Sequence, residues 1–175
     1  MIRVAAFSDL NRVEDSYKKH FTYERKNGAF TVFKEVVYPT RQDAETALQN
    51  DELYICEIEN EYMGSIIFSR KQPIDYESIN WKYQTDNSKI AIIHLLMVRP
   101  SMKGKGIATE LIRFAIDLAK EQVCEVIRLD TGEQNIPAVS LYKKMGFEIA
   151  EITSMNVGGA IEHKNHLFME RKIIS

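Results

Sequence analysis

The sequence predicts an α/β fold in which a mixed sheet carries helices on both faces. Two patterns lead to this prediction. In the second half of the chain, a strand expected over 89–98 is followed by a helix over 104–121 and a strand over 126–129. Such a unit joins parallel strands through a right-handed crossover. Earlier, the three polar residues 59–61 separate two apolar runs, which is the pattern of an antiparallel hairpin.

The composition is that of one globular domain over residues 1–175, because 45% of the residues are hydrophobic and 27% are charged. No apolar run approaches the roughly 20 residues that span a bilayer, so a membrane protein is not expected. The formal net charge of −2 argues against a general nucleic-acid-binding domain, which is usually strongly basic.

The two cysteines, Cys56 and Cys124, each lie in or beside an apolar run. They are too few for a disulfide framework and form no Cys-x-x-Cys pair, so buried thiols are expected. The first residues lack the apolar segment of a secretion signal. We therefore expect a cytoplasmic protein with reduced thiols.

The first elements are a short strand and a helix. Residues 2–7 are apolar enough for a strand, and Ser8 is placed to cap a helix that runs to about Lys26. Residues 30–37 are apolar and β-branched, and their pattern fits a strand or a helix.

A second helix and the hairpin follow. Thr40 opens the helix, since Asp43 at the third helical position nearly completes a capping box, and the helix ends near Asn50. The hairpin strands are predicted over 53–58 and 62–70.

Two features interrupt this regular pattern. Gly64 weakens the second strand of the hairpin and is typical of a bulge. The polar segment 71–88 is long for a loop of a compact domain, and such loops are often functional. The alternative is a surface loop that is held in place by its aromatic residues, Tyr76, Trp81 and Tyr83.

The remaining elements follow from apolar spacing. In the helix over 104–121, apolar residues recur on one face, at Ile107, Leu111, Phe114, Ala115 and Leu118. A further helix over 135–145 stops at Gly146. Strands over 147–152 and 167–173 complete the expected elements.

The segment with the clearest chemistry follows the strand over 89–98, which is apolar on both faces and therefore expected at the centre of the sheet. Gly104 and Gly106 let the backbone approach a ligand and point several N–H groups the same way. The free N–H groups of the next helix favour an anion such as phosphate, and Lys103 and Lys105 add positive charge. The alternative is that the glycines only turn the chain.

Two motifs resemble the GCN5-related N-acetyltransferase (GNAT) superfamily. Residues 103–108 are similar to its signature Gln/Arg-x-x-Gly-x-Gly/Ala, with Lys103 in place of Gln or Arg, and read Lys103-Gly104-Lys105-Gly106-Ile107-Ala108. Six residues match Asn-x-x-Ala-x-x-Leu-Tyr-x-x-x-Gly-Phe: Asn135, Ala138, Leu141, Tyr142, Gly146 and Phe147. The resemblance covers roughly 53–154 and implies a mostly antiparallel central sheet of six to seven strands.

The resemblance implies that acetyl-CoA binds where the fourth and fifth strands splay apart. Residues 103–108 would hold its pyrophosphate, and Asn135 would hydrogen-bond the CoA arm. The backbone of the central strand would contact the pantetheine through Leu96, Met97 and Val98.

His94 and Tyr142 are the candidate base and acid. An alkylamine is protonated at neutral pH and must lose a proton before it attacks a thioester. His94 is the only ionisable residue over 90–98, and strand alternation places it on the face of Ile92 and Leu96. The resemblance implies that a histidine at this spacing removes the proton and that Tyr142 lies near the sulfur. The alternatives are a hydrogen-bonded core histidine and a packing tyrosine.

Other polar residues are weaker candidates. His163 and His166 lie near Glu162 without a third ligand nearby, so a solvated loop is favoured and no metal is expected. His20 is expected on a surface helix. Glu133, after the fifth strand, could meet a cationic amine, but a plain loop acid is favoured.

By resemblance, the acceptor site involves the N-terminal helices, the loop over 71–88 and the final strands. Its aromatic residues could line the pocket, and its acids Asp75, Glu77 and Asp86 could attract a cation.

The sequence thus predicts an acetyl-CoA-dependent N-acetyltransferase in which a primary amine attacks directly within a ternary complex. The acceptor is a small-molecule or peptide amine, and no nucleic acid or membrane partner is expected. Family members are often dimers, which leaves a homodimer open. The alternative is a non-catalytic acyl-CoA-binding sensor or interaction module, and a third possibility is a nucleotide phosphate-binding enzyme.

Overall fold

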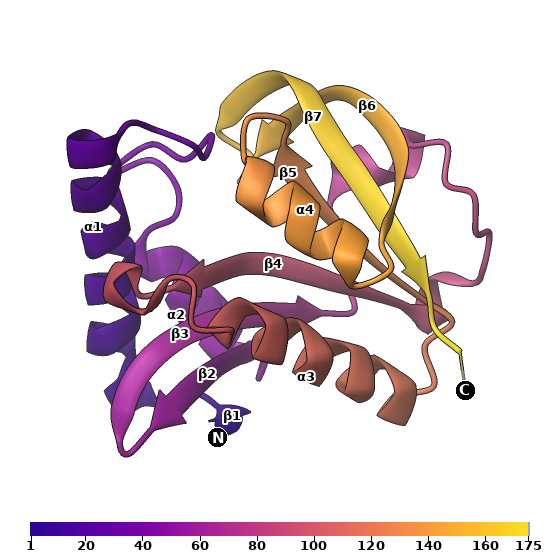
Figure 1. The fold of residues 1–175 in the computed structure, drawn as a ribbon. Helices are drawn as coiled ribbons and strands as arrows, with labels where there is room; N and C mark the ends of the chain where they lie inside the picture. Colours follow the sequence, from indigo (N-terminus) through magenta and orange to yellow (C-terminus); the bar gives the residue numbers. More distant parts are fainter. Residues whose placement is uncertain (175) are drawn as a thin grey trace.

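The computed structural model describes residues 1–174 and contains a seven-stranded sheet with helices on both faces (Figure 1). The strand order is β1-β2-β3-β4-β5-β7-β6. The strands are β1 (Ile2–Val4), β2 (Leu53–Ile58), β3 (Glu61–Ser69), β4 (Ile90–Val98), β5 (Val126–Gly132), β6 (Glu148–Val157) and β7 (Ile161–Lys172). The α-helices are α1 (Leu10–Asn27), α2 (Arg41–Gln49), α3 (Ile107–Glu121) and α4 (Ile136–Lys144).

The pairing confirms the predicted mixed, mostly antiparallel sheet. β4 and β5 are parallel and are joined through α3, whereas the other neighbouring strands pair antiparallel. β4 is the fourth of seven strands, as its two apolar faces predicted.

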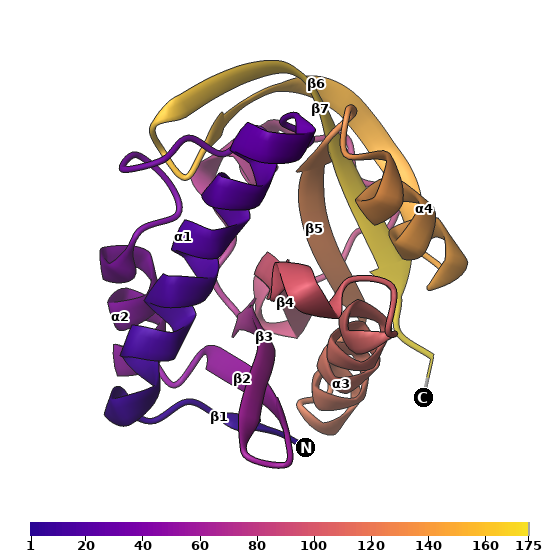
Figure 2. The same cartoon turned by 60° about the vertical axis from the view of Figure 1, so that its left-hand side comes forward.

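Two layers of helices cover the sheet. The core on one face combines residues of α3 and α4 with β3, β4, β5 and β7, and it includes both cysteines as buried free thiols. The core on the other face packs α1 and α2 against β2, β3 and β4. Figure 2 shows α1 and α2 on one side of β4, and α3 on the other. Within residues 1–174, no helix is both long and apolar enough to cross a membrane.

The N-terminal elements differ from the prediction in their bounds. β1 ends at Val4, and a 3₁₀ turn over Phe7–Asp9 precedes α1. Residues 30–37 form neither a strand nor a helix; their one sheet-like contact is an isolated bridge between Lys34 and Tyr38. Residues 30–33 are half-buried, and the N–H groups of Phe30 and Thr31 donate to the Glu24 side chain rather than to a neighbouring strand.

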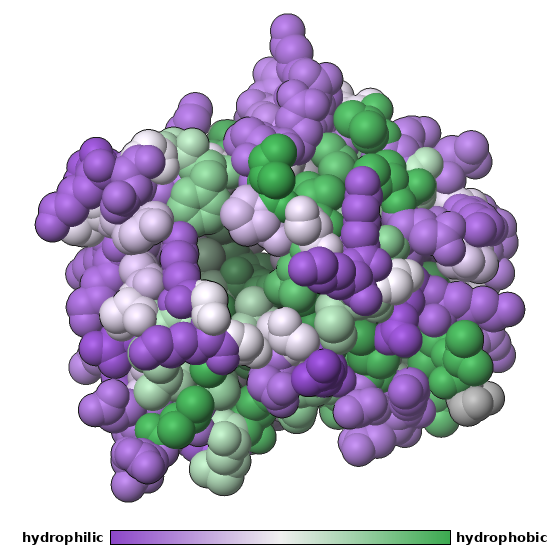
Figure 3. All heavy atoms as spheres, in the orientation of Figure 1, coloured by the Kyte–Doolittle hydropathy of each residue, from purple (hydrophilic) through white to green (hydrophobic). Residues whose placement is uncertain are grey.

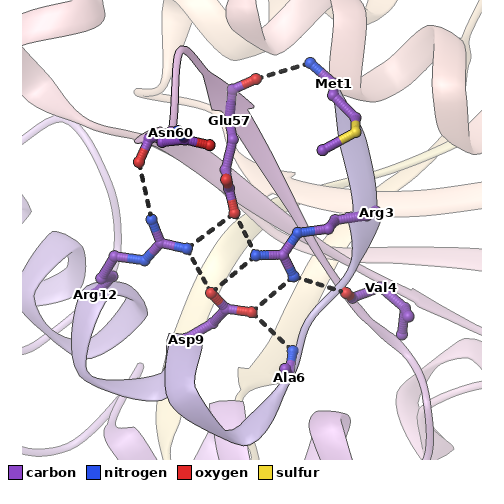
Figure 4. A network of polar contacts seen from close by, with 8 residues as sticks. All are labelled: Met1, Arg3, Val4, Ala6, Asp9, Arg12, Glu57 and Asn60. Carbon is purple, nitrogen blue, oxygen red and sulfur yellow. Dashed lines mark hydrogen bonds and ion pairs between the residues drawn. The ribbon is translucent and has the colours of Figure 1, made fainter.

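A polar network ties this N-terminal segment to the first hairpin (Figure 4). The Asp9 carboxylate is 3% exposed and accepts hydrogen bonds from the Arg3 guanidinium and the Ala6 N–H, at 2.8 and 2.7 Å. Arg12 contacts Asp9 as well, and both arginines also reach Glu57 on β2. The network therefore fixes the start of α1 relative to β2.

The helix over 40–50 and the hairpin follow the prediction closely. Thr40 and Asp43 form the capping box, and α2 ends at Gln49 with Asn50 as its C-cap. The ladder between β2 and β3 shifts register opposite Gly64, which confirms a bulge there.

The last two strands are much longer than predicted. β6 and β7 form a hairpin over 148–157 and 161–172, whereas the sequence predicted strands over 147–152 and 167–173. In the middle of the hairpin, only alternate residues are buried, among them Met155, Val157 and Ile161, and the residues between them are polar. Such a half-buried strand lacks a continuous apolar run.

Candidate active site

β4 and β5 part in the middle of the sheet and open a cavity between them. They pair only as far as Ile92 with Arg128, and Figure 1 shows β5 diverging from β4 beyond that point. A cavity of about 1070 Å³ lies there, lined by residues of both strands, α1, the loop before α3, α4 and the β6–β7 hairpin. Figure 3 shows a hollow in this face of the molecule with apolar side chains in its depth.

A bulge in β4 changes which side chains face the cavity. Leu95 has a φ of 44°, a left-handed conformation that is rare for a branched residue, and the β3–β4 register shifts at this point. Leu95 and Met97 pack toward α1, whereas Leu96 and Val98 pack toward α3. The prediction that His94 shares a face with Leu96 is therefore wrong, because the bulge breaks the alternation between them.

The loop before α3 forms one end of the cavity. Gly104 and Gly106 have φ values of 76° and 81°, so α3 begins at Ile107 rather than at Gly104 as predicted. A Cβ atom built on either glycine would meet nothing within 4 Å. The loop is therefore an open cradle that leads directly into the free N–H groups of α3, and Ala108 also lines the cavity.

The two lysines of this loop behave differently. The Lys103 ammonium lies over the rings of Tyr23 and Phe30, at 3.9 and 4.1 Å from their centroids. Burial lowers the pKa of Lys103, although the charge of Glu24 opposes this. Lys105 is exposed, and it does not line the cavity.

His94 lies half-buried in the cavity wall, and its ring makes no hydrogen bond to any of residues 1–174. Burial lowers the pKa of His94, and the negative charge of Asp130 partly opposes this. The lowered pKa favours the neutral imidazole, whose ring nitrogens are open to a bound ligand.

Tyr142 and Asn135 line the cavity from α4. Burial raises the pKa of the Tyr142 phenol well above its usual value, and the charge of Asp130 adds to the effect, so the hydroxyl keeps its proton. The Asn135 side-chain oxygen accepts the Ala138 N–H at 3.4 Å, which caps α4 and leaves the amide N–H₂ unused. The cavity thus brings together Leu96, Met97, Val98, Lys103, Gly104, Gly106, Ile107, Ala108, Asn135, His94 and Tyr142.

A buried polar chain that the sequence did not predict also reaches the cavity. Asp130 accepts the Tyr76 hydroxyl at 2.6 Å, and its other oxygen lies 2.6 Å from Nε2 of His166. Nδ1 of His166 lies 3.1 Å from Nδ1 of His163. The expected solvated loop at His163 and His166 is therefore wrong, because both lie on β7 and His166 is 1% exposed.

His20 is also misplaced by the prediction, since it is buried rather than on a surface. Its Nε2 lies 2.9 Å from Glu24 and 3.2 Å from the Thr31 hydroxyl. Glu24 in turn accepts the N–H groups of Phe30 and Thr31, which holds this segment against the cavity.

The aromatic residues of the 71–88 loop do not line the cavity as expected. Tyr76 and Trp81 are buried against β5 and β7, and only the start of the loop, including Asp75, reaches the cavity wall. Glu133 is exposed and lies outside the cavity. Asp130 lies within β5, which is buried along nearly all of its length, two residues after Arg128.

Comparison with known proteins identifies the architecture. Residues 11–147 match the acetyltransferase (GNAT) family model. An uncharacterized N-acetyltransferase of Methanocaldococcus jannaschii is 30% identical over 102 residues, which are 58% of this chain and 41% of that protein. The chain spans 22–64% of the length of three curated relatives that it matches.

Solved structures show the same fold. A GNAT-family acetyltransferase of Listeria monocytogenes superposes with a TM-score of 0.77 at 18% identity, covering 98% of this chain and 94% of that chain. A Salmonella typhimurium protein, solved with its cofactor acetyl-CoA, superposes with a TM-score of 0.69 at 16% identity, covering 100% and 94%. Together with the family match over most of its length, the parted strands and the glycine cradle show that this chain belongs to the GNAT family of acetyltransferases.

Proposed function

We propose that the protein is an acetyl-CoA-dependent N-acetyltransferase that acts by direct attack of a primary amine within a ternary complex. One observation carries this proposal: the glycine cradle, a free histidine and a protonated phenol all face a single cavity between β4 and β5. The Salmonella typhimurium protein of the same fold is described with acetyl-CoA as its cofactor, which supports the choice of acyl donor.

The residues present fit such a donor. The N–H groups at the start of α3, beside Gly104 and Gly106, suit a pyrophosphate, since they are free and the helix dipole favours an anion. Beyond Ile92, β4 loses its pairing with β5, so its backbone groups up to Val98 are available to the amide groups of a pantetheine arm. The unused amide of Asn135 supplies a further hydrogen bond.

Acid and base roles follow from the protonation states. Neutral His94 takes a proton from the acceptor R–NH₃⁺, and the freed lone pair attacks the thioester carbon. The C–S bond then breaks with its electron pair on sulfur, and the Tyr142 hydroxyl, which lines the same cavity, gives its proton to that thiolate and regains one from solvent. The second amine proton leaves to solvent as the amide forms.

The competing proposal is an acyl-CoA sensor without catalysis. A free base and a protonated acid in the same cavity favour catalysis, because a sensor needs neither. Incubation with acetyl-CoA and a panel of small amines and peptides, followed by free thiol and product mass, separates the two. Transfer to any amine supports the enzyme. A raised Tm with acetyl-CoA but no transfer across the panel supports the sensor.

A further inference from the structure

The charged residues of the cavity wall are unevenly distributed. Lys103 belongs to the glycine loop, and no other lysine or arginine among residues 1–174 lines the cavity. The wall also carries two carboxylates, Asp75 and Asp130. The part of the wall that these two residues form therefore favours a cation.

Asp130 is a buried carboxylate in the cavity wall whose ion-pair partner is a histidine. Its side chain is 12% exposed, and its salt-bridge partner is a histidine, His166, rather than a lysine or arginine. Burial raises the pKa of Asp130, but the hydrogen bond and the charge of His166 and the Tyr76 hydroxyl lower it further, so the carboxylate is ionised. Ionised groups are costly to bury unless a charge pairs with them.

The geometry fixes how this carboxylate faces the cavity. Tyr76 holds one oxygen and His166 holds the other, so the group cannot rotate freely. Each oxygen keeps a lone pair for another donor, because a carboxylate offers about four acceptor sites. The last β4–β5 pair joins Ile92 to Arg128, so His94 and Asp130 stand level, two residues further along neighbouring strands.

We propose that Asp130 binds the acceptor as an ammonium ion beside His94, which makes strongly basic alkylamines the preferred acceptors. This inference rests on the proposed function for its catalytic meaning. The ammonium adds a positive charge beside a carboxylate whose ion-pair partner is a histidine, and His94 then removes one ammonium proton, leaving the neutral amine. Weakly basic amines, which are uncharged at neutral pH, gain nothing from Asp130.

A matched pair of probes tests the site without requiring turnover. Benzylammonium and benzyl alcohol have the same ring and differ in charge, so their effects on Tm at equal ionic strength isolate the ammonium contact. We expect the wild-type protein to bind benzylammonium about 10- to 100-fold more tightly than the alcohol, and Asp130→Asn to lose this preference. Glu133→Gln, which neutralises an exposed acid outside the cavity, should keep it.

Turnover gives the second readout. With benzylamine as acceptor, Asp130→Asn should raise KM about tenfold or more, whereas the KM for aniline should change less than threefold. Equal ammonium preference in the wild type and in Asp130→Asn would overturn the inference even if acetyl transfer occurs. Ammonium preference that depends on Asp130 without any thiol release would support the cation site and contradict the proposed transferase instead.

The fold of the variant is checked independently, since Asp130 also bonds Tyr76 and His166. Tyr76→Phe removes one of these bonds but keeps the charge. If Asp130 acts through its charge, Tyr76→Phe retains the ammonium preference. If Asp130→Asn and Tyr76→Phe both lose the ammonium preference and their Tm values fall by a similar amount, Asp130 has a structural role and the inference fails.

Discussion

At the scale of single residues, His94 is controlled by two opposing effects. Burial in the cavity wall favours the neutral ring, and the level carboxylate of Asp130 favours the protonated one. Burial dominates, so the pKa of His94 lies below the ordinary histidine value and the ring is neutral at pH 7. This is the state that a base requires before it takes a proton.

We expect kcat/KM to fall on the acid side as His94 gains a proton, with a midpoint below the usual histidine pKa of about 6.5. His94→Gln should lower kcat about 10²- to 10⁴-fold and remove this acid limb. Asp130→Asn should shift the limb to lower pH, because the stabilising negative charge is gone. The measurement is a pH–rate profile of each variant with acetyl-CoA binding checked by Tm.

An unchanged acid limb in His94→Gln would contradict the assignment and place the titrating group elsewhere. His20 and His166 also line the cavity, and His166 lies 2.6 Å from Asp130.

The sequence singled out His94 and Tyr142 as candidates, and both line the cavity, but it did not predict the contact between Asp130 and His166. Both candidates lie within local motifs whose spacing can be read directly. Asp130 and His166 are 36 residues apart and meet because β5 and β7 pair. No local sequence pattern predicts such a contact. The polar residues around His166 are typical of a loop, so a loop was predicted there.

At the scale of elements, the positions that need particular residues are those where two elements meet closely. Gly64 on β3 stands opposite Val98 of β4, next to the bulge that shapes the cavity. A Cβ atom there would lie 2.7 Å from the Met97 carbonyl oxygen and 3.2 Å from the Val98 Cα atom. Both neighbours are backbone and cannot move aside.

Gly64→Ala should therefore force β3 and β4 apart at the cavity. We expect a loss of about 1–3 kcal/mol in the free energy of unfolding, measured by urea denaturation. Acetyl-CoA binding should weaken as well, since Met97 and Val98 line the cavity. Glu61→Ala, at the exposed start of the same strand, serves as the control, and equal stability of the two variants would refute the steric argument.

The N-terminal network makes a pH-dependent contribution. Burial raises the pKa of Asp9, but hydrogen bonds from Arg3, Ala6 and Arg12 outweigh it and lower the pKa to about 2. Because the folded value lies below the ordinary value of 3.8, this stabilisation is complete above about pH 4 and is lost as the pH falls toward 2.

Asp9→Asn should lower the free energy of unfolding by about 2 kcal/mol at pH 7, because Arg3 and Arg12 lose a buried anionic partner. The difference from the wild type should shrink when unfolding is measured near pH 2. Asp15→Asn on α1, an exposed acid paired with Lys19, should change stability little at either pH. A pH-independent effect of Asp9→Asn would show that packing, not charge, dominates.

At the scale of the whole molecule, prediction succeeded where a sheet strand or helix is recognisable by itself. β4, α3 and the capping box of α2 carry strong local patterns and were found within about three residues. β6 and β7 were predicted too short because their polar halves become strands only by pairing with each other. Both kinds of element line the cavity, so the elements around the glycine loop were predicted better than the β6–β7 hairpin.

Lys103 connects the glycine loop before α3 with the N-terminal segment 28–33. Its ammonium rests on the rings of Tyr23 and Phe30, next to the segment that Glu24 holds against the cavity. The cradle and the N-terminal segment are therefore coupled through one side chain.

Lys103→Met retains the length of the side chain but removes its charge, so the cation–π contacts are lost. Each is worth about 0.5–1 kcal/mol at an exposed site, and we expect the N–H groups over 28–33 to exchange hydrogen about 2- to 5-fold faster. Lys105→Met removes the same charge from the same loop without touching the rings. Lys105→Met should weaken acetyl-CoA binding but leave hydrogen exchange over 28–33 unchanged. Equal exchange rates in Lys103→Met and Lys105→Met would show that the glycine loop and segment 28–33 are independent.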